Sequence, residues 1–150
     1  MSLTDIVGKL FVPRQKEVQK YQHHAEDIQN GVLRHLVSRG TATEYGRNHL
    51  FSTINGYEDF ARNVPLNTYE ELKGDIDRMR HGESNILWPG NIKWYAKSSG
   101  TTNDKSKFIP VSHEGLHNIH YRGGFDAVAL YLRNNPKSRL FDGRSLILGG

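Results

Sequence analysis

The sequence predicts an α/β fold in which an N-terminal layer of helices is followed by the beginning of a sheet. Three observations lead to this prediction. Apolar residues recur at helical spacing over residues 13–39, two short β-rich runs within 92–111 flank a hydroxyl-rich loop, and an apolar run at 145–148 is typical of a buried strand. The 150 residues fit one domain or one piece of a larger one.

The first element is predicted as one long amphipathic helix over residues 13–39. Pro13 suits a first helical turn, and Gly40 suits the position just after a helix end. The apolar residues of its stripe recur at steps of three and four: Val18, Tyr21, Ala25, Ile28, Val32, Leu33, Leu36 and Val37. We interpret this stripe as a packing face.

Two shorter helices are expected next. Asn55 with Glu58, and Thr68 with Glu71, each have the spacing of an N-cap residue and a reciprocal acid three residues later. Gly82 is expected to end the second helix. We interpret both helices as part of the helical layer, without a chemical role.

The segment 92–111 is predicted as strand, loop and strand. Residues 92–96 and 107–111 are rich in residues that favour a sheet, and Pro110 indicates an edge or the end of a strand. A helix capped by Ser112 is expected to run to about Arg133. Its inward-facing residues are predicted to be Leu116, Ile119, Val128, Ala129 and Leu132. Because Gly149-Gly150 directly follows the apolar run 145–148, we expect the sequence to be cut from a longer protein.

The composition excludes several classes of protein. Hydrophobic residues make up 36% and charged residues 24%, with a mean hydropathy of −0.65, as in soluble globular proteins. The chain has no run approaching about eighteen apolar residues, so we expect no membrane association. The absence of cysteine excludes disulfides and thiolate metal sites, and it suits a cytoplasmic protein.

The basic charge is concentrated where the loop lies. A net charge of +4 and a pI of about 9.4 raise the question of nucleic-acid binding. However, acidic residues are interspersed along most of the chain, and positive charge gathers only at 78–81 and 97–107. The second cluster coincides with the hydroxyl-rich loop, so a phosphate ligand explains it better. We expect no nucleic-acid partner.

The loop has the composition of an anion site. Its backbone and hydroxyl donors come from Ser98, Ser99, Gly100, Thr101 and Thr102, with positive charge from Lys105 and Lys107. Gly100 allows the backbone to approach a ligand closely. A Walker A loop is excluded because Asp104, not glycine, precedes Lys105. The alternative interpretation is a polar hairpin with an exposed tip.

Residues 95–110 resemble the first ATP-binding motif of the plant auxin-responsive acyl-acid amido synthetases and their bacterial relatives. This family lies within the wider adenylate-forming group, which includes luciferases and acyl-CoA synthetases. The likeness extends upstream to 42–46, 64–72, 76–78 and 82–83, and it spans roughly positions 10 to 150. It implies that residues 1–150 are the N-terminal portion of a single larger ATP-binding domain. The fold is then a helical layer plus the beginning of the luciferase-like large domain.

The resemblance implies a two-step, ATP- and Mg²⁺-dependent ligase that joins a small carboxylic acid to an amino acid or amine. The loop hydroxyls would bind the ATP phosphates, and Lys105 and Lys107 would neutralise charge. In the family the helix after the loop borders the acyl-acid pocket, which assigns His120, Tyr121 and Arg122 to the substrate. The adenine, ribose and metal contacts would lie beyond residue 150, so the chain alone should be inactive.

One departure from the family concerns the loop itself. The family usually has glycine or another small residue close after the hydroxyls, whereas this chain has Asn103-Asp104. Asp104 adds a negative charge next to the expected anion.

Two rival functions rest on other features. His113-Glu114-Gly115-Leu116-His117 satisfies the zinc-protease signature, in which two histidines bind the metal and the glutamate activates water. No glutamate follows Glu114 as a third ligand, so we interpret the motif as a chance match and expect no metal site. A noncatalytic helical interaction module would rest on the stripe at 13–39.

Overall fold

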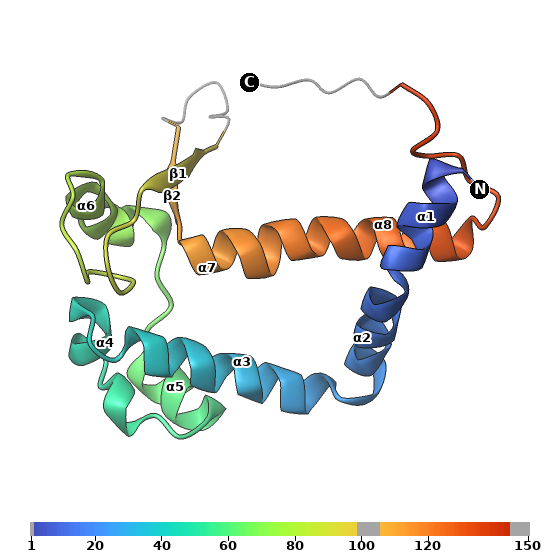
Figure 1. The fold of residues 1–150 in the computed structure, drawn as a ribbon. Helices are drawn as coiled ribbons and strands as arrows, with labels where there is room; N and C mark the ends of the chain where they lie inside the picture. The colour runs from blue at the N-terminus through green and yellow to red at the C-terminus, as the bar shows by residue number, and fades with distance from the viewer. Residues whose placement is uncertain (1, 99–105, 145–150) are drawn as a thin grey trace. The chain divides into compact units, whose positions relative to one another are not determined.

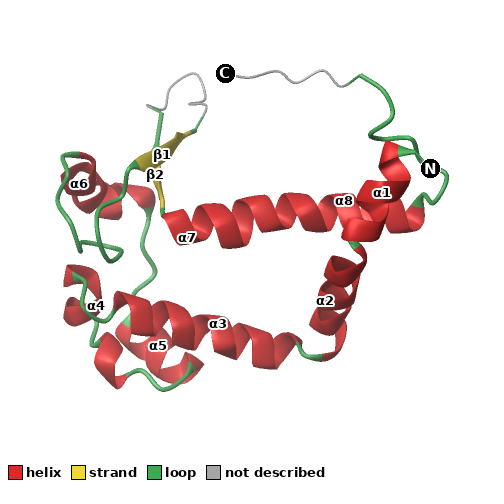
Figure 2. Cartoon of the chain, viewed as in Figure 1, coloured by secondary structure: helices red, strands yellow, loops and turns green. Residues whose placement is uncertain are grey.

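The computed structural model describes residues 2–98 and 106–144. These residues form helices and one two-stranded antiparallel sheet, as Figures 1 and 2 show. In chain order the elements are α1 (Leu3–Leu10), α2 (Val12–His23), α3 (Ala25–Gly40), α4 (Glu44–Asn48), η1 (Phe51–Thr53), α5 (Tyr57–Asn63), α6 (Tyr69–Arg80), β1 (Trp94–Lys97), β2 (Phe108–Val111), α7 (His113–Gly115), η2 (Leu116–Tyr121) and α8 (Arg122–Asn134).

This mostly helical architecture is consistent with the N-terminal part of an α/β protein. The run at 145–148, predicted as a further strand, lies outside the described residues, and the luciferase-like large domain stays a prediction. The chain divides into two compact units: residues 26–116, and residues 1–25 together with 117–150. Each unit is described by itself below. Across 2–98 and 106–144, we find no helix with the length and apolar character needed to cross a membrane.

The segment predicted as one helix over 13–39 consists of two helices. Pro13 lies in the first turn of α2, as expected, but the helix ends at His23, and His24 leaves helical geometry with φ −132° and ψ 29°. The charges explain the break. Lys20 and His23 lie in the last turn of α2, and acidic residues occupy the first turn of α3, which suits the dipoles of two separate helix ends.

The apolar stripe of this segment is only partly a packing face. Val37 is buried, with 5% of its surface exposed, whereas Tyr21, Val32 and Leu36 keep 42%, 52% and 45% exposed. Gly40 is the last residue of α3 and is buried, so its predicted position just after the helix end is wrong by one residue.

The unit of residues 1–25 and 117–150 is built on α1, α2 and α8. An ion pair joins α2 to α8: the Arg14 guanidinium donates to both carboxylate oxygens of Asp126 at 2.8 Å. The rings of Phe11 and Phe125 lie 5.8 Å apart between centroids. On α8, the predicted inward residues Ala129 and Leu132 are buried.

The N-terminal helix α1 had no sequence prediction. A capping box between Ser2 and Asp5 starts it. Its buried Thr4 ties it to the segment after α8, because the Thr4 N–H donates to Asp142 Oδ1 at 3.2 Å and the Thr4 hydroxyl accepts from the Phe141 N–H at 3.0 Å.

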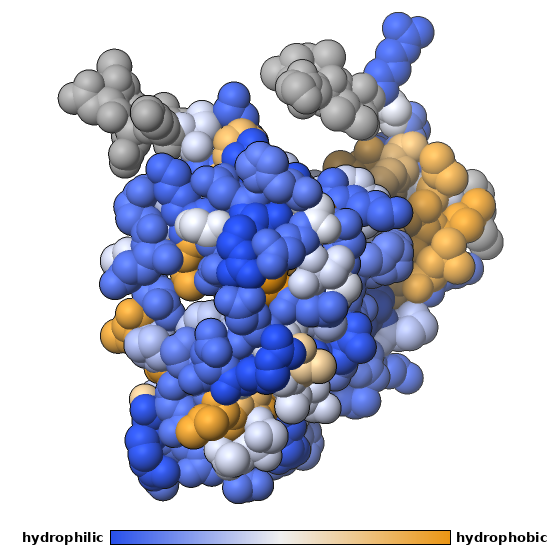
Figure 3. All heavy atoms as spheres, turned by 90° about the vertical axis from the view of Figure 1, so that its left-hand side faces the viewer, coloured by the Kyte–Doolittle hydropathy of each residue, from blue (hydrophilic) through white to orange (hydrophobic). Residues whose placement is uncertain are grey.

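The unit of residues 26–116 has a small apolar core. Met79 of α6 packs with Ile86 and Ile92 from the segment between α6 and β1, and Leu87, Trp88 and Tyr95 border this cluster. Figure 3 looks onto the side of the molecule that carries α4 and α6, and this face is largely hydrophilic with separate apolar patches.

The first turn of α4 is anchored by Thr43, which is completely buried. Its hydroxyl donates to the Gly40 carbonyl at 2.7 Å and accepts from the Gly46 N–H at 2.9 Å. The next two residues reach the segment after α6, where the N–H groups of Glu44 and Tyr45 donate to the carbonyls of residues 85 and 86 at 2.8 and 3.1 Å. The helix is therefore held by backbone as well as side-chain contacts.

Arg78 of α6 binds three carboxylates. Its guanidinium donates to both oxygens of Glu44 (2.7 and 3.0 Å), to both oxygens of Glu83 (2.6 and 2.9 Å) and to Asp75 (3.1 Å). Hydrogen bonds from Arg78 lower the pKa of Glu44 and of Glu83. In turn, the hydrogen bonds to Glu83, and after them those to Glu44, raise the pKa of Arg78.

The two predicted capping boxes differ in outcome. At α6 the box is confirmed: the Glu71 carboxylate accepts from the Thr68 N–H at 2.6 Å, and the Thr68 hydroxyl accepts from the Glu71 N–H at 3.4 Å. At α5 the prediction is wrong, because Gly56 is the N-cap and makes no side-chain bond. Here the Asn55 N–H donates to Asp59, which lies one residue beyond the expected Glu58, at 3.0 Å.

The helix expected from Ser112 to about Arg133 is present, but part of it is a π-helix instead of an α-helix. The Ser112 hydroxyl caps it by accepting from the Gly115 N–H at 2.9 Å, as predicted. Residues 116–121 then adopt a π-helix before α8 begins. Ile119 lies in this π-helical stretch and is 75% exposed, so its predicted inward position is wrong.

Replacing Gly46 by alanine should destabilise the unit of residues 26–116. A Cβ at this position would lie 2.0 Å from the Gly40 carbonyl oxygen, which is backbone and cannot rotate away. We expect a loss of roughly 1–3 kcal/mol, as for other overpacked sites. Chemical denaturation followed by tryptophan fluorescence measures it. Gly74→Ala in α6 is the matched control, because its Cβ meets open space; it should gain about 0.5–1 kcal/mol. Equal stability of the two variants would contradict the packing argument.

Replacing Arg78 by methionine should remove stability at neutral pH and little in acid. The pKa values of Glu44 and Glu83 lie below their usual 4.5 in the folded chain, so the unfolded chain binds protons first as the pH falls. Their contribution is therefore complete above pH 4.5 and is lost below it. In denaturation curves from pH 7 to about pH 3, the free energies of unfolding of the wild type and of Arg78→Met should converge as the pH falls. Arg62→Met removes an exposed pair with Asp59, and its free energy of unfolding should differ less from that of the wild type. A difference in the free energy of unfolding between Arg78→Met and the wild type that does not change with pH contradicts the prediction.

Candidate nucleotide-phosphate site

The stem of the predicted phosphate loop is an antiparallel hairpin. Lys97 of β1 pairs with Phe108 of β2, and Tyr95 pairs with Pro110. The strands occupy 94–97 and 108–111, slightly shorter than the predicted 92–96 and 107–111. The structure thus brings the two flanks of the loop together as the sequence predicted.

Ser98 and Lys107 close the stem. The Ser98 N–H donates to the Lys107 carbonyl at 2.9 Å, and the Lys107 N–H donates to the Ser98 hydroxyl at 3.0 Å. The Ser98 hydroxyl accepts this N–H through a lone pair, so the contact does not use its own proton. Ser98 therefore has a structural role that the sequence did not predict.

The remaining loop residues lie outside the described residues. These are Ser99, Gly100, Thr101, Thr102 and Lys105. Their contacts with ATP phosphates stay a prediction.

The side chain of Lys107 lies against helix α6. Its ammonium is 5.3 Å from the centre of the Tyr69 ring, within the range of a cation–π interaction. Within 2–98 and 106–144, Lys107 has no carboxylate partner. Its charge is thus held against an aromatic face at the base of the hairpin.

Helix α6 contacts β2 from both of its ends. Tyr69, its first residue, accepts the Phe108 N–H at its hydroxyl, at 3.0 Å. Arg80, its last residue, places its guanidinium 3.8 Å from the centre of the Phe108 ring. Tyr69 and Phe108 are 39 residues apart in the chain. No spacing pattern indicates such a contact, which is why the sequence assigned Tyr69 no role.

The side chain of Tyr95, in strand β1, packs against the apolar core of this unit. Its hydroxyl is buried and has no hydrogen-bond partner among the described residues. Burial raises the pKa of Tyr95, so the hydroxyl stays neutral.

The residues predicted for the acyl-acid pocket lie at the junction of the π-helix η2 with α8. His120, Tyr121 and Arg122 are exposed, and the His120 and Tyr121 rings are 5.5 Å apart between centroids. Such π-helical turns frequently occur at functional sites. The substrate role of these three residues stays a prediction.

The zinc-protease motif is not favoured. Glu114, the expected base, is hydrogen-bonded to His35 and forms an ion pair with Arg39 of α3 at 3.5 Å. The His113 ring contacts Trp94, with centroids 6.3 Å apart. In the part of the chain that the structure describes, no three His, Cys, Asp or Glu residues could hold a metal ion together.

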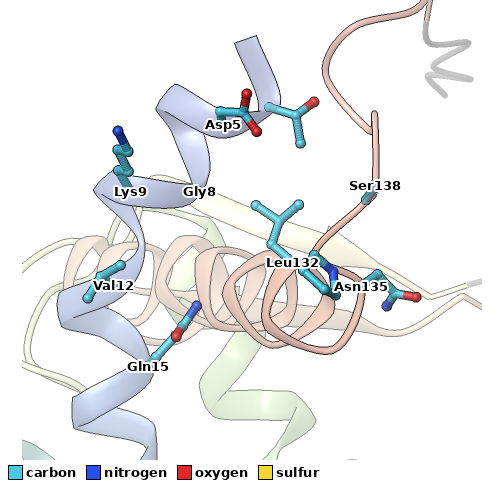
Figure 4. Close-up of a pocket in the computed structure, with 10 residues that line it drawn as sticks. Asp5, Gly8, Lys9, Val12, Gln15, Leu132, Asn135 and Ser138 are labelled. Atoms are coloured by element: carbon cyan, nitrogen blue, oxygen red, sulfur yellow. The ribbon is translucent and has the colours of Figure 1, made fainter. Parts of the chain in front are cut away.

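Besides a hollow of about 480 Å³ along α2, between Lys16 and His24, two further hollows of the described residues lie away from the hairpin stem. The larger, of about 520 Å³, lies in the unit of residues 1–25 and 117–150 (Figure 4). Its lining comes from α1, the start of α2, the end of α8 and the turn that follows: Thr4, Asp5, Gly8, Lys9, Val12, Gln15, Leu132, Asn135, Pro136 and Ser138. The smaller, of about 220 Å³, lies beside Trp94 and His113 at the end of the hairpin away from Ser98. Neither hollow is lined by Ser98 or Lys107.

Several plant proteins are similar to this chain. Indole-3-acetic acid-amido synthetase GH3.15 of Arabidopsis thaliana is 34% identical over 125 residues, which is 83% of this chain and 20% of that protein. A probable indole-3-acetic acid-amido synthetase, GH3.7 of rice (Oryza sativa subsp. japonica), is 35% identical over 73% of this chain and 18% of its own length. The 4-substituted benzoates-glutamate ligase GH3.12 of Arabidopsis thaliana is 29% identical over 71% of this chain and 19% of that protein.

These relatives define a class, the acyl-acid amido synthetases. A family model described as the GH3 family N-terminal domain matches residues 14–148, which is nearly the whole chain. The chain therefore belongs to the GH3 family of auxin-responsive acyl-acid amido synthetases. It spans about a fifth of the length of these relatives.

Replacing Ser98 by alanine should loosen the stem of the loop. The Lys107 N–H loses its acceptor, and a hydrogen bond of this kind contributes about 1 kcal/mol. Exchange of the Lys107 amide, measured by NMR or mass spectrometry, should become roughly fivefold faster. Ser52→Ala, at an exposed serine of η1 in the same unit, is the control and should leave this exchange unchanged. An unchanged rate in Ser98→Ala contradicts the assigned contact.

Proposed function

We propose that this chain supplies the phosphate-binding hairpin of an ATP-dependent acyl-acid amido synthetase. The observation that carries the proposal is the closed stem: Ser98 and Lys107 join the two ends of a hydroxyl-rich, basic loop within a chain of this family. The closed stem holds the two ends of the loop together, and we infer that loop N–H and hydroxyl groups bind one anion there.

The proposed reaction has two steps. In the first, a carboxylate oxygen of the acid attacks the α-phosphorus of ATP, the bond to the β-phosphate oxygen breaks, and pyrophosphate leaves with the bonding electrons. In the second, the nitrogen of an amino acid or amine attacks the acyl carbon of the acyl-adenylate. AMP leaves, and the amine loses a proton to give the amide.

The hairpin would act by position and charge. Ser98, Ser99, Thr101 and Thr102 donate hydrogen bonds to phosphate oxygens, the Gly100 backbone approaches them, and Lys105 and Lys107 neutralise the charge that develops during in-line attack. Hydrogen bonds to charged groups contribute about 1.5–3 kcal/mol each, so several together make a substantial contribution. Asp104 lowers this benefit by its negative charge.

The other parts of the reaction fall to other residues. His120, Tyr121 and Arg122 are proposed to border the acid, with Arg122 pairing with its carboxylate. The stem residues Ser98 and Lys107 offer no carboxylate suited to Mg²⁺, so we assign them no metal. The adenine, ribose and metal contacts are proposed to come from residues beyond 150, which makes the 150-residue chain inactive alone. We propose a cytoplasmic enzyme without nucleic-acid or membrane partners.

ATP-dependent exchange of labelled pyrophosphate by the full-length protein tests this function across a panel of carboxylic acids. We expect exchange with at least one acid, and a loss of about a hundredfold in Ser99→Ala and Thr101→Ala, as for other lost oxyanion donors. Ser38→Ala, at an exposed position of α3, is the control and should leave the rate unchanged. The absence of exchange with any acid contradicts the proposal.

The zinc alternative predicts a different result. A zinc hydrolase would carry one zinc ion per chain and lose it in His117→Ala. We expect elemental analysis of the full-length protein to find no stoichiometric zinc that depends on His117.

A further inference from the structure

We propose that Tyr69 is a positioning residue for the nucleotide: it sets the place of Lys107 beside the ATP phosphates. The inference rests on the proposed function and assigns a role in it to a residue outside the loop. It follows from two contacts of one side chain, one with Lys107 and one with Phe108, the first residue of β2.

The first contact gives a hydrogen-bond acceptor to a backbone N–H at the open edge of the hairpin. In an antiparallel pair, hydrogen-bonded and non-hydrogen-bonded residue pairs alternate. Ser98 and Lys107 form a hydrogen-bonded pair, so the N–H of Phe108 points away from β1, toward the open edge of the sheet. The Tyr69 hydroxyl accepts this N–H at 3.0 Å and so takes the place of a third strand. Pro110, two residues on, has no N–H to leave unpaired at the same edge.

The second contact holds the lysine itself. The Tyr69 ring lies under the Lys107 ammonium, 5.3 Å from ring centre to nitrogen. A carboxylate at this place would cancel the positive charge. An aromatic face holds the ammonium without cancelling its positive charge, so that charge can still act on a phosphate.

Tyr69 is itself firmly placed. It is the first residue of α6, directly after the confirmed capping box of Thr68 and Glu71. The far end of α6 also contacts β2, through Arg80 and the Phe108 ring at 3.8 Å. The position of Lys107 therefore depends on its contact with helix α6 and not on the loop alone.

A double-mutant cycle in the full-length protein tests the inference. The variants are Tyr69→Leu, which loses the ring and the hydroxyl, Tyr69→Phe, which loses only the hydroxyl, Lys107→Met, and Tyr69→Leu with Lys107→Met. Tyr57→Phe is the matched control, because Tyr57 is also the first residue of a helix, α5, and is 70% exposed. The readouts are kcat/KM for ATP and KM for the acid, both from pyrophosphate exchange.

If Tyr69 acts through Lys107, Tyr69→Leu lowers kcat/KM for ATP by roughly tenfold, leaves KM for the acid unchanged, and adds no further loss to Lys107→Met. Tyr69→Phe keeps the ring and should recover part of the loss, and Tyr57→Phe should match the wild type.

A purely structural role gives another pattern. The losses from Tyr69→Leu and Lys107→Met then multiply in the double variant, or KM for the acid changes together with kcat/KM for ATP. Either result overturns the inference while the proposed function stands. Absence of exchange in the wild type overturns both. Amide exchange of residues 106–111, which needs no ATP, reports separately whether the Tyr69 hydroxyl protects the Phe108 N–H in Tyr69→Phe.

Discussion

The arginine at position 78 connects the parts of the unit that carries the hairpin. It binds Glu44 at the start of α4, Glu83 in the segment after α6, and Asp75 one turn earlier in its own helix. A single guanidinium can satisfy so many oxygens because it presents five donors in a plane. These pairs are partly exposed, so their value comes from being a network around one cation and not from any single pair.

The backbone reinforces this network at the same place. The first residues of α4 donate to carbonyls at 85 and 86, and Ile86 enters the apolar core with Met79 and Ile92. Two residues after Ile92, the chain becomes β1. The arginine cluster thus places the segment that leads into the hairpin, while Tyr69 and Arg80 of the same helix hold the returning strand β2. Helix α6 therefore positions both strands of the candidate site.

Local signals predicted what local energetics controls. Thr68 and Ser112 were recognised as helix caps because capping depends on residues three positions apart. The same rule failed at Asn55, where Asp59 accepts the N–H that Glu58 was expected to accept. The long helix over 13–39 was over-predicted because apolar periodicity continues across His24, while the charges on either side mark a break.

By itself, the sequence determined the family, the helical layer and the position of the hairpin, since residue identities and short spacings carry these signals. Only the tertiary structure decided what each side chain does there. Ser98 closes the stem, Lys107 rests on the Tyr69 ring, and Glu114 is occupied by His35 and Arg39 instead of standing ready for a metal. The last two contacts join residues far apart in the chain. Their geometry depends on how helices and strands pack, which no local pattern encodes.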